Sequence, residues 1–324
     1  MIIKDKIYGE IKIKDLVLIE FLESPSLLRL KKMSNYGIPD KYYHHKGYSR
    51  YEHSVGVMIL LKKFGASLEE QIAGLVHDVS HLAFSHVADW IFSGGENGDK
   101  EELADNLLEK IIRTTELAKI LEKFNLSIER IINKKNDFPL LEKNIPNLCA
   151  DRIDYVLREL KYTWGVKQEV LNTYLKYLVN FNGEIVFLDE KVAFDFAKDF
   201  IELQTKHWGS REAMVRYYLF AKVMKIALSK RILLKKYFFK EEDFVLRKIE
   251  KINDKEIKNI LALLRKKKIS QKSSGSFKKV FKKFRYVDPK VLVNVDLLKL
   301  SEINHKFEKM IKKHQEINKK GIII

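Results

Sequence analysis

The chain has 324 residues, of which 46% are hydrophobic and 32% charged, and its net charge is +17 at pH 7. This length suits one large domain or a catalytic domain with an appendage, and the apolar content supports a sizeable core and argues against disorder. The single Cys149 excludes an internal disulfide and fits a reducing cytoplasm. Charged residues interrupt the N-terminus, and no uncharged apolar run is long enough to span a membrane. We therefore expect a cytoplasmic protein without a membrane segment.

The low content of Gly and Pro, with abundant Leu, Ile, Lys and Glu, predicts an all-α, mostly helical fold. Residues 7–13 alternate around Gly9 and indicate a short N-terminal strand or β-hairpin. Apolar residues at three- and four-residue spacing predict the helices that follow. These helices cover residues 14–22, 25–33, 50–64, 68–79, 101–112, 115–124, 148–162, 167–181, 190–207 and 211–231. A loop is expected at 94–99 and a strand at 184–188.

The C-terminal part of the chain is expected to form a separate, basic and helical lobe. We place the boundary so that residues 1–231 form the first domain and residues 232–324 the lobe. Residues 230–285 contain 20 Lys or Arg and 6 Asp or Glu, an excess of 14 positive charges. Such a region can attract the phosphates of nucleotides or nucleic acids, so a weak contact with a polyanion is expected. A solvated, Lys-rich face is the other interpretation.

The sequence of this lobe predicts two local features. Residues 270–276, rich in Ser and Gly, indicate a flexible break. Phe277, Phe281 and Phe284 follow at spacings of four and three residues, which predicts a helix that packs its apolar stripe on the rest of the molecule.

Four side chains form the most informative pattern of the sequence: His53, the adjacent His77 and Asp78, and Asp151. Two imidazoles and two carboxylates suit a divalent ion such as Mn, Fe, Ni, Co or Zn. Neighbouring residues on a helix project about 100° apart, so His77 and Asp78 can share an ion only if it lies over the edge between their faces. His53 and Asp151 would then complete the ligand set from other helices.

The segments that carry these residues resemble a known family. Residues 49–57 (SRYEHSVGV), 72–86 (IAGLVHDVSHLAFSH) and 150–155 (ADRIDY) are similar to the HD superfamily of metal-dependent phosphohydrolases, and within it to the dNTP triphosphohydrolase branch. The resemblance covers roughly residues 1–230. It implies a mostly helical HD-domain fold with one catalytic divalent ion (Mn, Fe, Ni, Co, Zn or Mg), and relatives that are often multimeric, so a homo-oligomer is expected.

The resemblance also assigns roles to single residues. Asp154 lies three residues after Asp151 and could replace it as a ligand, but the family pattern of an Asp followed by a basic residue and a Tyr selects Asp151. Arg152 and Tyr155 match the substrate contacts of that helix. Arg50 lies one turn before His53 and could bind a substrate phosphate beside the ion.

Three further residues match the family's proton-transfer machinery. His81 would share the face of His77 if the helix continues. His86 and Asp89 are three residues apart, so that the carboxylate could fix the tautomer of an imidazole that donates or takes the proton. We therefore assign His86, Asp89 and His81 as candidate catalytic residues.

The sequence also departs from the family pattern. Residues 81–86 read HLAFSH where the family usually has HGPFSH, and the family's later His is missing, so that Glu101 or Glu102 would have to replace it. Asn35 stands where the dNTP branch has a Gln that contacts the deoxyribose. Arg211 is retained on the helix beside the sugar, but Val215 and Leu219 follow where the branch has His and Tyr.

The sequence thus predicts a phosphohydrolase in which metal-activated water attacks a nucleotide, with a (deoxy)nucleoside triphosphate as the first choice of substrate. Two alternatives stay open. One is a nucleotidase or phosphodiesterase that acts on monophosphates or nucleic-acid ends, which an altered sugar pocket permits. The other is a non-catalytic nucleotide- or nucleic-acid-binding module.

Overall fold

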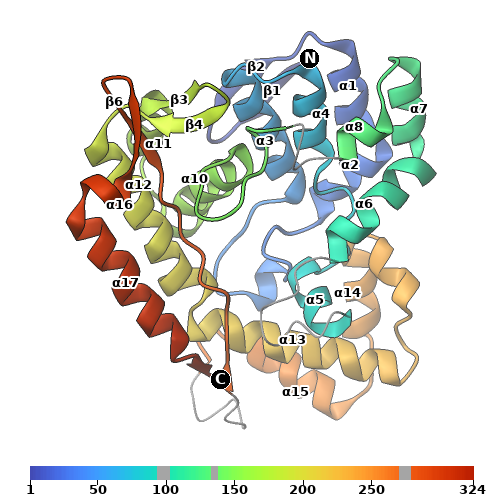
Figure 1. Cartoon of the computed structure of the whole chain (residues 1–324). Helices are drawn as coiled ribbons and strands as arrows, with labels where there is room; N and C mark the ends of the chain where they lie inside the picture. The colour runs from blue at the N-terminus through green and yellow to red at the C-terminus, as the bar shows by residue number, and fades with distance from the viewer. Residues whose placement is uncertain (93–102, 133–137, 270–278) are drawn as a thin grey trace.

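The computed structural model describes residues 1–92, 103–132, 138–269 and 279–324. The predicted loop at 94–99, the break at 270–276, Phe277, and the pair Glu101 and Glu102 lie outside these residues. The mostly helical fold is confirmed (Figure 1). No helix of the described ranges is both long and apolar enough to cross a membrane.

The helices follow the apolar periodicity closely in the first two thirds of the chain. The α-helices are α1 Leu16–Glu23, α2 Pro25–Arg29, α3 Arg50–Lys63, α4 Leu68–Val76, α5 Ser85–Phe92, α6 Leu103–Thr114, α7 Glu116–Lys123, α8 Ile128–Ile132, α10 Ala150–Trp164, α11 Gln168–Tyr177, α12 Glu190–Leu203, α13 Arg211–Ser229, α14 Glu242–Glu250, α15 Lys255–Leu264, α16 Leu300–Ile303 and α17 His305–Lys319. Short 3-10 helices are η1 Leu30–Lys32, η2 Asp40–Tyr42 and η5 Lys235–Phe239, and η4 Gln204–Trp208 is a π-helix.

The strands are short and form three small sheets. They are β1 Ile2–Asp5, β2 Gly9–Lys12, β3 Leu178–Phe181, β4 Glu184–Phe187, β5 Lys279–Val280, β6 Lys290–Val293, β7 Asp296–Lys299 and β8 Ile322–Ile323. The predicted N-terminal hairpin is the antiparallel pair β1–β2. A four-stranded sheet has the order β3-β4-β6-β7, and β5 pairs with β8. Strand β3 and the strands after residue 278 were not predicted from the sequence.

Several predicted helix ends differ from the structure for local reasons. The helix expected over 68–79 ends at Val76, because residues 77–80 form a turn. The helix expected over 167–181 ends at Tyr177, and the chain continues as β3 to pair with β4. Residues 281–289 are irregular, so the helix predicted around Phe281 and Phe284 is wrong. Phe281 is exposed, and Phe284 stacks on Tyr286 instead of packing as a helical stripe.

Two clusters of buried apolar side chains support the molecule. The first is built mainly on α1, α3, α4, α10 and α12, and it also takes in Val287, Leu300 and Phe307 from the end of the chain. The second joins residues 36–48 and α5 to α13, α14 and α15. After residue 279 the chain runs upward from α13 to β6, which pairs with β4 (Figure 1). The boundary at residues 231 and 232 stays a prediction, and apolar contacts cross it in both clusters.

Candidate metal centre and cavity

A cavity of about 680 Å³ lies between the elements that carry the HD-like motifs. This volume falls in the range of small-molecule sites. Among the described residues its wall combines six basic and six acidic side chains with histidines and aromatic rings. The lining residues are Asn35, Tyr36, Arg50, His53, His77, Asp78, His81, His86, Asp89, Ala104, Asp105, Leu141, Glu142, Lys143, Asn144, Ile145, Asp151, Arg152, Tyr155, Glu159, Gln204, Trp208, Tyr217, Lys282, Lys283, Phe284 and Arg285.

Helix α3 positions the first histidine. Ser49 and Glu52 form a capping box, in which the Ser49 side chain accepts from the Glu52 N–H and the Glu52 carboxylate accepts from the Ser49 N–H at 2.8 Å. This start places Arg50 and His53 on the buried side of the helix, where both are almost fully buried. Arg50 is therefore an interior side chain that faces the site rather than a surface residue.

The two ligand histidines present the same ring nitrogen to each other. His53 Nδ1 is 2.7 Å from Asp154 Oδ2, and His77 Nδ1 is 2.6 Å from the Gly74 carbonyl oxygen. Both Nδ1 atoms thus face acceptors, which favours a proton on Nδ1 and a lone pair on Nε2. The two Nε2 atoms are 3.2 Å apart.

The structure separates the roles of the two carboxylates of α10. Asp151 Oδ1 lies 3.0 Å from His53 Nε2 and 3.7 Å from His77 Nε2, on the ligand side of both rings. Asp154 is fully buried on the opposite side of His53, where it also accepts from Arg158 at 2.8 Å. Asp154 is therefore an orienting partner of His53, which supports the choice of Asp151 as the ligand.

A glycine on α3 makes the approach of Asp154 feasible. A Cβ built at Gly56 would lie 1.9 Å from Asp154 Oδ1, far inside van der Waals contact. Only glycine at this position lets the α10 carboxylate reach the ring of His53. The Tyr8 hydroxyl closes the same network from the N-terminal hairpin, donating to Asp154 Oδ1 at 2.7 Å.

Asp78 lies at the edge of the group, and its carboxylate contacts one arginine and two histidines. Its Oδ2 accepts from Arg50 at 2.7 Å, while its Oδ1 lies 3.4 Å from His77 Nε2 and 3.1 Å from His81 Nε2. Because α4 ends at Val76, His77 and Asp78 lie on a turn, so the argument from 100° helical spacing does not apply. His81 reaches Asp78 through this turn rather than along a helix face.

The turn that follows His77 is held by residues that the motif alone does not reveal. One Arg29 nitrogen donates to the carbonyls of Val79 and His81 at 2.8 Å each. Glu242 of α14 accepts from the Phe84 N–H at 3.2 Å, and Phe84 has a positive φ of 59°. These contacts hold the turn in which Leu82 and Ala83 stand at the positions of the Gly and Pro of the HGPFSH pattern. An arginine 50 residues earlier gives no local sequence signal of this role.

His86 and Asp89 both line the cavity from α5, and the hydrogen bond predicted between them is not formed in this structure. Within the described ranges no hydrogen bond joins them, because the His86 ring lies edge-on toward Tyr217 of α13, with centroids 6.4 Å apart. Burial and the nearby charges of Arg50 and Lys282 hold the pKa of His86 well below its usual range. Burial raises the pKa of Asp89 to about 7 against the opposing charges of the same two cations. These effects favour the neutral form of the His86 ring.

The predicted substrate contacts fall into two groups. Asn35 and Tyr155 line the cavity, where Asn35 donates to the Tyr48 hydroxyl at 3.0 Å. Arg152 also lines it, but its guanidinium donates to the Asn147 and Lys143 carbonyls at 2.6 and 2.5 Å. Arg211 is not among the described lining residues and donates to the Ile269 carbonyl at 3.2 Å. The structure therefore does not bring Arg211 to the cavity.

The cavity wall includes residues that the sequence analysis did not single out. Those from the second half of the chain include cationic and aromatic side chains: Trp208 of η4, Tyr217 of α13, and Lys282, Lys283 and Arg285 of the irregular segment before β6. The signal that could have found them is weak, because a lysine-rich segment is common in this chain. Only the path of residues 279–289 across the molecule brings Lys282, Lys283 and Arg285 to the site (Figure 1).

The donor set fits a divalent cation. His53, His77 and Asp151 each offer one ligand atom, and these atoms all lie within 4.8 Å of one another. Two imidazole lone pairs and a carboxylate oxygen that converge in this way repel one another unless a cation lies between them. Without an ion, a proton on His53 can supply the positive charge between these groups. Burial alone would lower the pKa of His53, but the hydrogen bonds with Asp151 and Asp154 raise this pKa to about 10. The hydrogen bonds of His53 and His77 overcome burial and hold the pKa of Asp151 far below its usual value.

The comparisons with known proteins agree with this geometry. A family model described as the HD domain matches residues 50–159. The chain is 32% identical to the uncharacterized protein YdhJ of Bacillus subtilis over 327 aligned positions, which cover all of this chain and 98% of that protein. It is 38% identical over 159 residues to the metal-dependent phosphohydrolase cns2 of Cordyceps militaris, covering 49% of this chain and 45% of the relative. The deoxynucleoside triphosphate triphosphohydrolase SAMHD1 of Gallus gallus is 28% identical over 150 residues, 40% of this chain and 24% of that protein.

The helical fold, the matched motifs and the full-length relative together define the class of this protein. It belongs to the HD-domain family of metal-dependent phosphohydrolases. Proteins of this family bind a divalent metal, and the His53, His77 and Asp151 group could hold such an ion.

Proposed function

We propose that this protein hydrolyses a nucleotide, with a deoxynucleoside triphosphate as the first choice of substrate. The observation that carries the proposal is one cavity that combines the His53–His77–Asp151 group with cationic and aromatic side chains. A nucleotide has a phosphate chain and a flat base, and these two kinds of side chain match its two ends. The names of the SAMHD1 relatives point to the same substrate class.

The ligand side chains would be His53, His77, Asp151 and Asp78, and the bound ion would supply a water of lowered pKa together with polarisation of a phosphoryl oxygen. Asp154 and the Gly74 carbonyl would keep the lone pairs of both histidines directed at the site. His86, neutral in the resting protein, would accept a proton and could later return it to the leaving group.

The phosphates would lie between the ligand group and the cations of the opposite wall. Arg50 is already engaged with Asp78 and Ser85, at 2.7 and 2.6 Å, so it would mainly hold Asp78 in place. Lys282, Lys283 and Arg285 line the cavity and are the better candidates to neutralise a polyphosphate. Tyr155 and Trp208, with ring centroids 5.5 Å apart, would border the base or sugar.

A second candidate function is hydrolysis of a nucleoside monophosphate or a nucleic-acid end. The position of Arg211 favours it, because this residue binds a backbone carbonyl away from the cavity. The sugar side of the cavity instead carries Tyr217 from the same helix, whose hydroxyl donates to the Tyr36 carbonyl at 2.9 Å. A pocket altered in this way could select a different nucleotide.

The test is a screen of the full chain with Mn²⁺, Co²⁺, Ni²⁺, Zn²⁺ or Mg²⁺ against deoxynucleoside and ribonucleoside triphosphates, monophosphates and short oligonucleotides. Products are separated by anion-exchange chromatography. We expect metal-dependent release of intact triphosphate and a nucleoside from the triphosphates. Release of orthophosphate from monophosphates or oligonucleotide ends alone would favour the second candidate. Binding without turnover of any substrate would leave only a nucleotide-binding module.

A further inference from the structure

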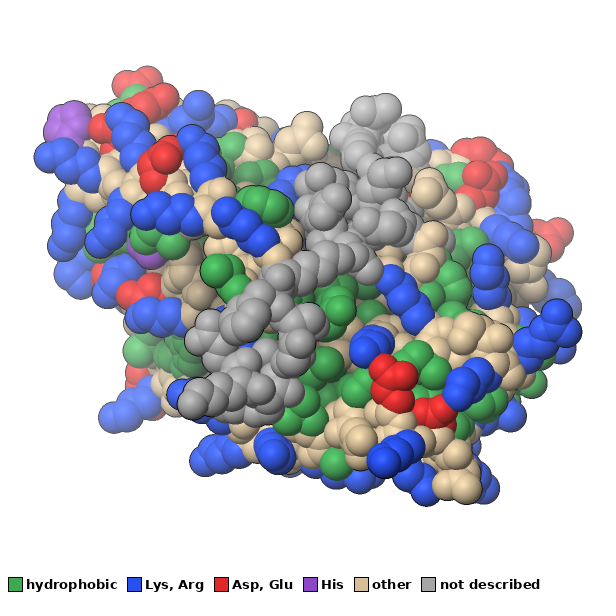
Figure 2. Space-filling view, turned by 90° about the horizontal axis from the view of Figure 1, so that it is seen from below, with side chains coloured by type: hydrophobic (Ala, Val, Ile, Leu, Met, Phe, Trp, Pro, Cys, Tyr) green, Lys and Arg blue, Asp and Glu red, His purple; other side chains and the backbone are tan. Residues whose placement is uncertain are grey.

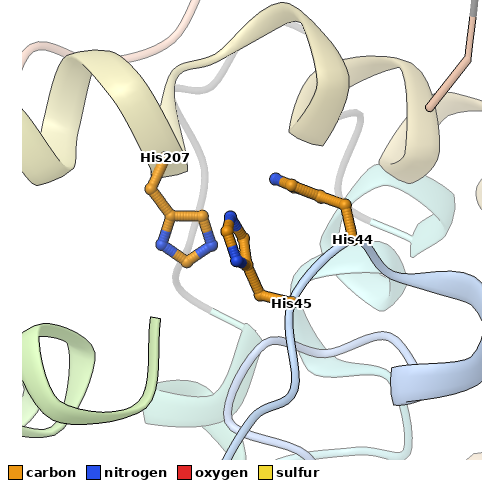
Figure 3. A group of neighbouring side chains, drawn as sticks. All are labelled: His44, His45 and His207. Carbon is orange, nitrogen blue, oxygen red and sulfur yellow. The ribbon is translucent and has the colours of Figure 1, made fainter. Parts of the chain in front are cut away.

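A second group of histidines lies outside the centre described above. His44 and His45 follow the 3-10 helix η2, and His207 belongs to the π-helix η4 more than 160 residues later (Figure 3). Each ring offers one nitrogen, and the three nitrogens lie within 4.8 Å of one another. The ring centroids are 4.3 Å apart for His44 and His45, and 4.8 Å apart for His45 and His207. No motif of the HD family led the sequence analysis to these residues.

The burial and partners of the rings leave lone pairs available. His207 is fully buried, whereas His44 and His45 are half-buried and give the group a side open to solvent. His44 Nδ1 and His207 Nδ1 are buried atoms that accept or donate no hydrogen bond within the described part of the chain. Glu159 Oε2 is 3.2 Å from His207 Nδ1, but without hydrogen-bond alignment. Buried polar atoms are normally satisfied, so two such atoms in one cluster need an explanation.

The surroundings of His44 and His45 lower the pKa of both imidazoles. Burial, followed by the charges of His45 and His207, lowers the pKa of His44 to about 3. Burial and the charge of His207 lower the pKa of His45 to about 4. Neutral imidazole is the form that binds metals, so His44 and His45 are held in the state that a metal ligand requires.

We propose that His44, His45 and His207 bind a second metal ion of the Zn²⁺, Co²⁺, Ni²⁺ or Cu²⁺ class. Imidazole nitrogen suits these ions, whereas Mg²⁺ prefers oxygen ligands. A tetrahedral zinc site places its nitrogen ligands about 3.3 Å from one another, with Zn–N distances of about 2.0–2.1 Å. Rotation of the two half-buried rings can close the remaining gap, and the open side leaves a fourth position for water.

The position of this site indicates what an ion there would do. Tyr43 precedes the two histidines, and its hydroxyl is 3.1 Å from His207 Nε2. The same π-helix carries Gln204 and Trp208, which line the catalytic cavity. An ion bound by His44, His45 and His207 would therefore fasten the segment that leads into α3 to the opposite wall of the cavity. π-Helical turns often occur at functional sites, which is consistent with such a role.

The test counts bound metal and does not depend on any hydrolytic activity. The full chain is stripped with a chelator, reloaded with Zn²⁺, dialysed and analysed for zinc per chain. We expect two equivalents in the parent, one in His45→Asn, one in His77→Ala and none in the double variant. His305→Asn is the matched control, because its side chain is 86% exposed and lies in neither group, and it should keep two. One equivalent in the parent, or two in His45→Asn, would overturn the proposal.

A second readout separates metal binding from a folding defect. Metal-free His45→Asn should unfold at the same temperature as the metal-free parent, and His44→Asn replaces it if it does not. In the His77→Ala background, added Zn²⁺ should raise the unfolding temperature through the remaining site. In His77→Ala/His45→Asn the same Zn²⁺ should give no shift. An equal shift in both backgrounds would show that the histidines only pack together.

Discussion

The cavity has two walls that differ in origin and in chemistry. One comes from residues 50–159, matched by the HD-domain model, and it carries His53, His77 and Asp151 with hydrogen bonds that fix each ring. The other comes from η4, α13 and residues 282–285, and it offers lysine, arginine and aromatic side chains. We infer that the first wall holds the ion and performs the chemistry, and that the second selects the substrate. Substitutions in the first wall should therefore impair metal binding or turnover, whereas substitutions in the second should impair substrate affinity.

The largest effect is expected from the first wall, in His77→Ala. Loss of His77 Nε2 removes one of the three convergent ligand atoms, so the catalytic ion should be lost and turnover should fall to background. Elemental analysis and the nucleotide assay measure both effects, and His314→Ala serves as a control outside both histidine groups. If His77→Ala kept both this ion and its activity, the claim that the first wall holds the catalytic ion would be contradicted.

His86→Ala should keep the ion and lose turnover by roughly 10²–10⁴-fold, the usual contribution of a general acid or base. The side chain lines the cavity but does not belong to the ligand group. Metal content and kcat should thus separate in this variant, whereas they fall together in His77→Ala. Wild-type kcat would show that another group transfers the proton.

Asp154→Asn tests whether the orienting carboxylate matters as much as a ligand. Replacement weakens the hydrogen bond at His53 Nδ1, so metal affinity should fall by roughly 10–100-fold. Asp5→Asn is the matched control, because Asp5 shares the buried Arg158 ion pair at 2.8 Å but is not bonded to His53. Both variants should lose stability, and only Asp154→Asn should lose metal affinity. Equal metal affinities would contradict the orienting role.

The second wall should respond with substrate affinity and pH dependence rather than with loss of metal. Lys282→Met removes a positive charge near the phosphates, and KM should rise by roughly 10-fold. The positive charge of Lys282 helps lower the pKa of His86, so this pKa should rise in Lys282→Met. As the pH is lowered, the variant should therefore lose activity at a higher pH than the parent. Lys266→Met, an exposed lysine after α15 that does not line the cavity, should change neither quantity. Figure 2, a view of the molecule from below, shows lysine and arginine side chains spread over that face. If Lys282→Met had the KM and the pH profile of the parent, the substrate phosphates would not lie beside Lys282.

The difference between the walls also explains what the sequence could predict. His53 and Asp151 lie on helices α3 and α10, and His77 follows directly after α4. All three stand in short local motifs, so the sequence alone identifies them. Asp154 was seen only as a rival ligand, because helical spacing cannot tell which side of an imidazole a carboxylate will occupy. The group of His44, His45 and His207 was missed, since two of its members are more than 160 residues from the third.

The C-terminal part shows where periodicity misleads. Phe281 and Phe284 have helical spacing, but the segment runs extended across the molecule toward β6 and β4, and its cations face the cavity. Pairing between strands over 100 residues apart leaves no local signal. Composition alone suggested a division at residues 231 and 232. The apolar contacts that cross this division join residues far apart in the sequence, so the sequence did not predict them.

The most direct test of the central claim follows the oxygen of water through the reaction. The parent protein is supplied with its divalent ion and its best nucleotide substrate in H₂¹⁸O, and the products are analysed by mass spectrometry. If water activated at the His53–His77–Asp151 group attacks phosphorus, the label should appear in the released phosphate product and the nucleoside should stay unlabelled. Label in the nucleoside, or labelled product formed equally well by His77→Ala, would contradict the account.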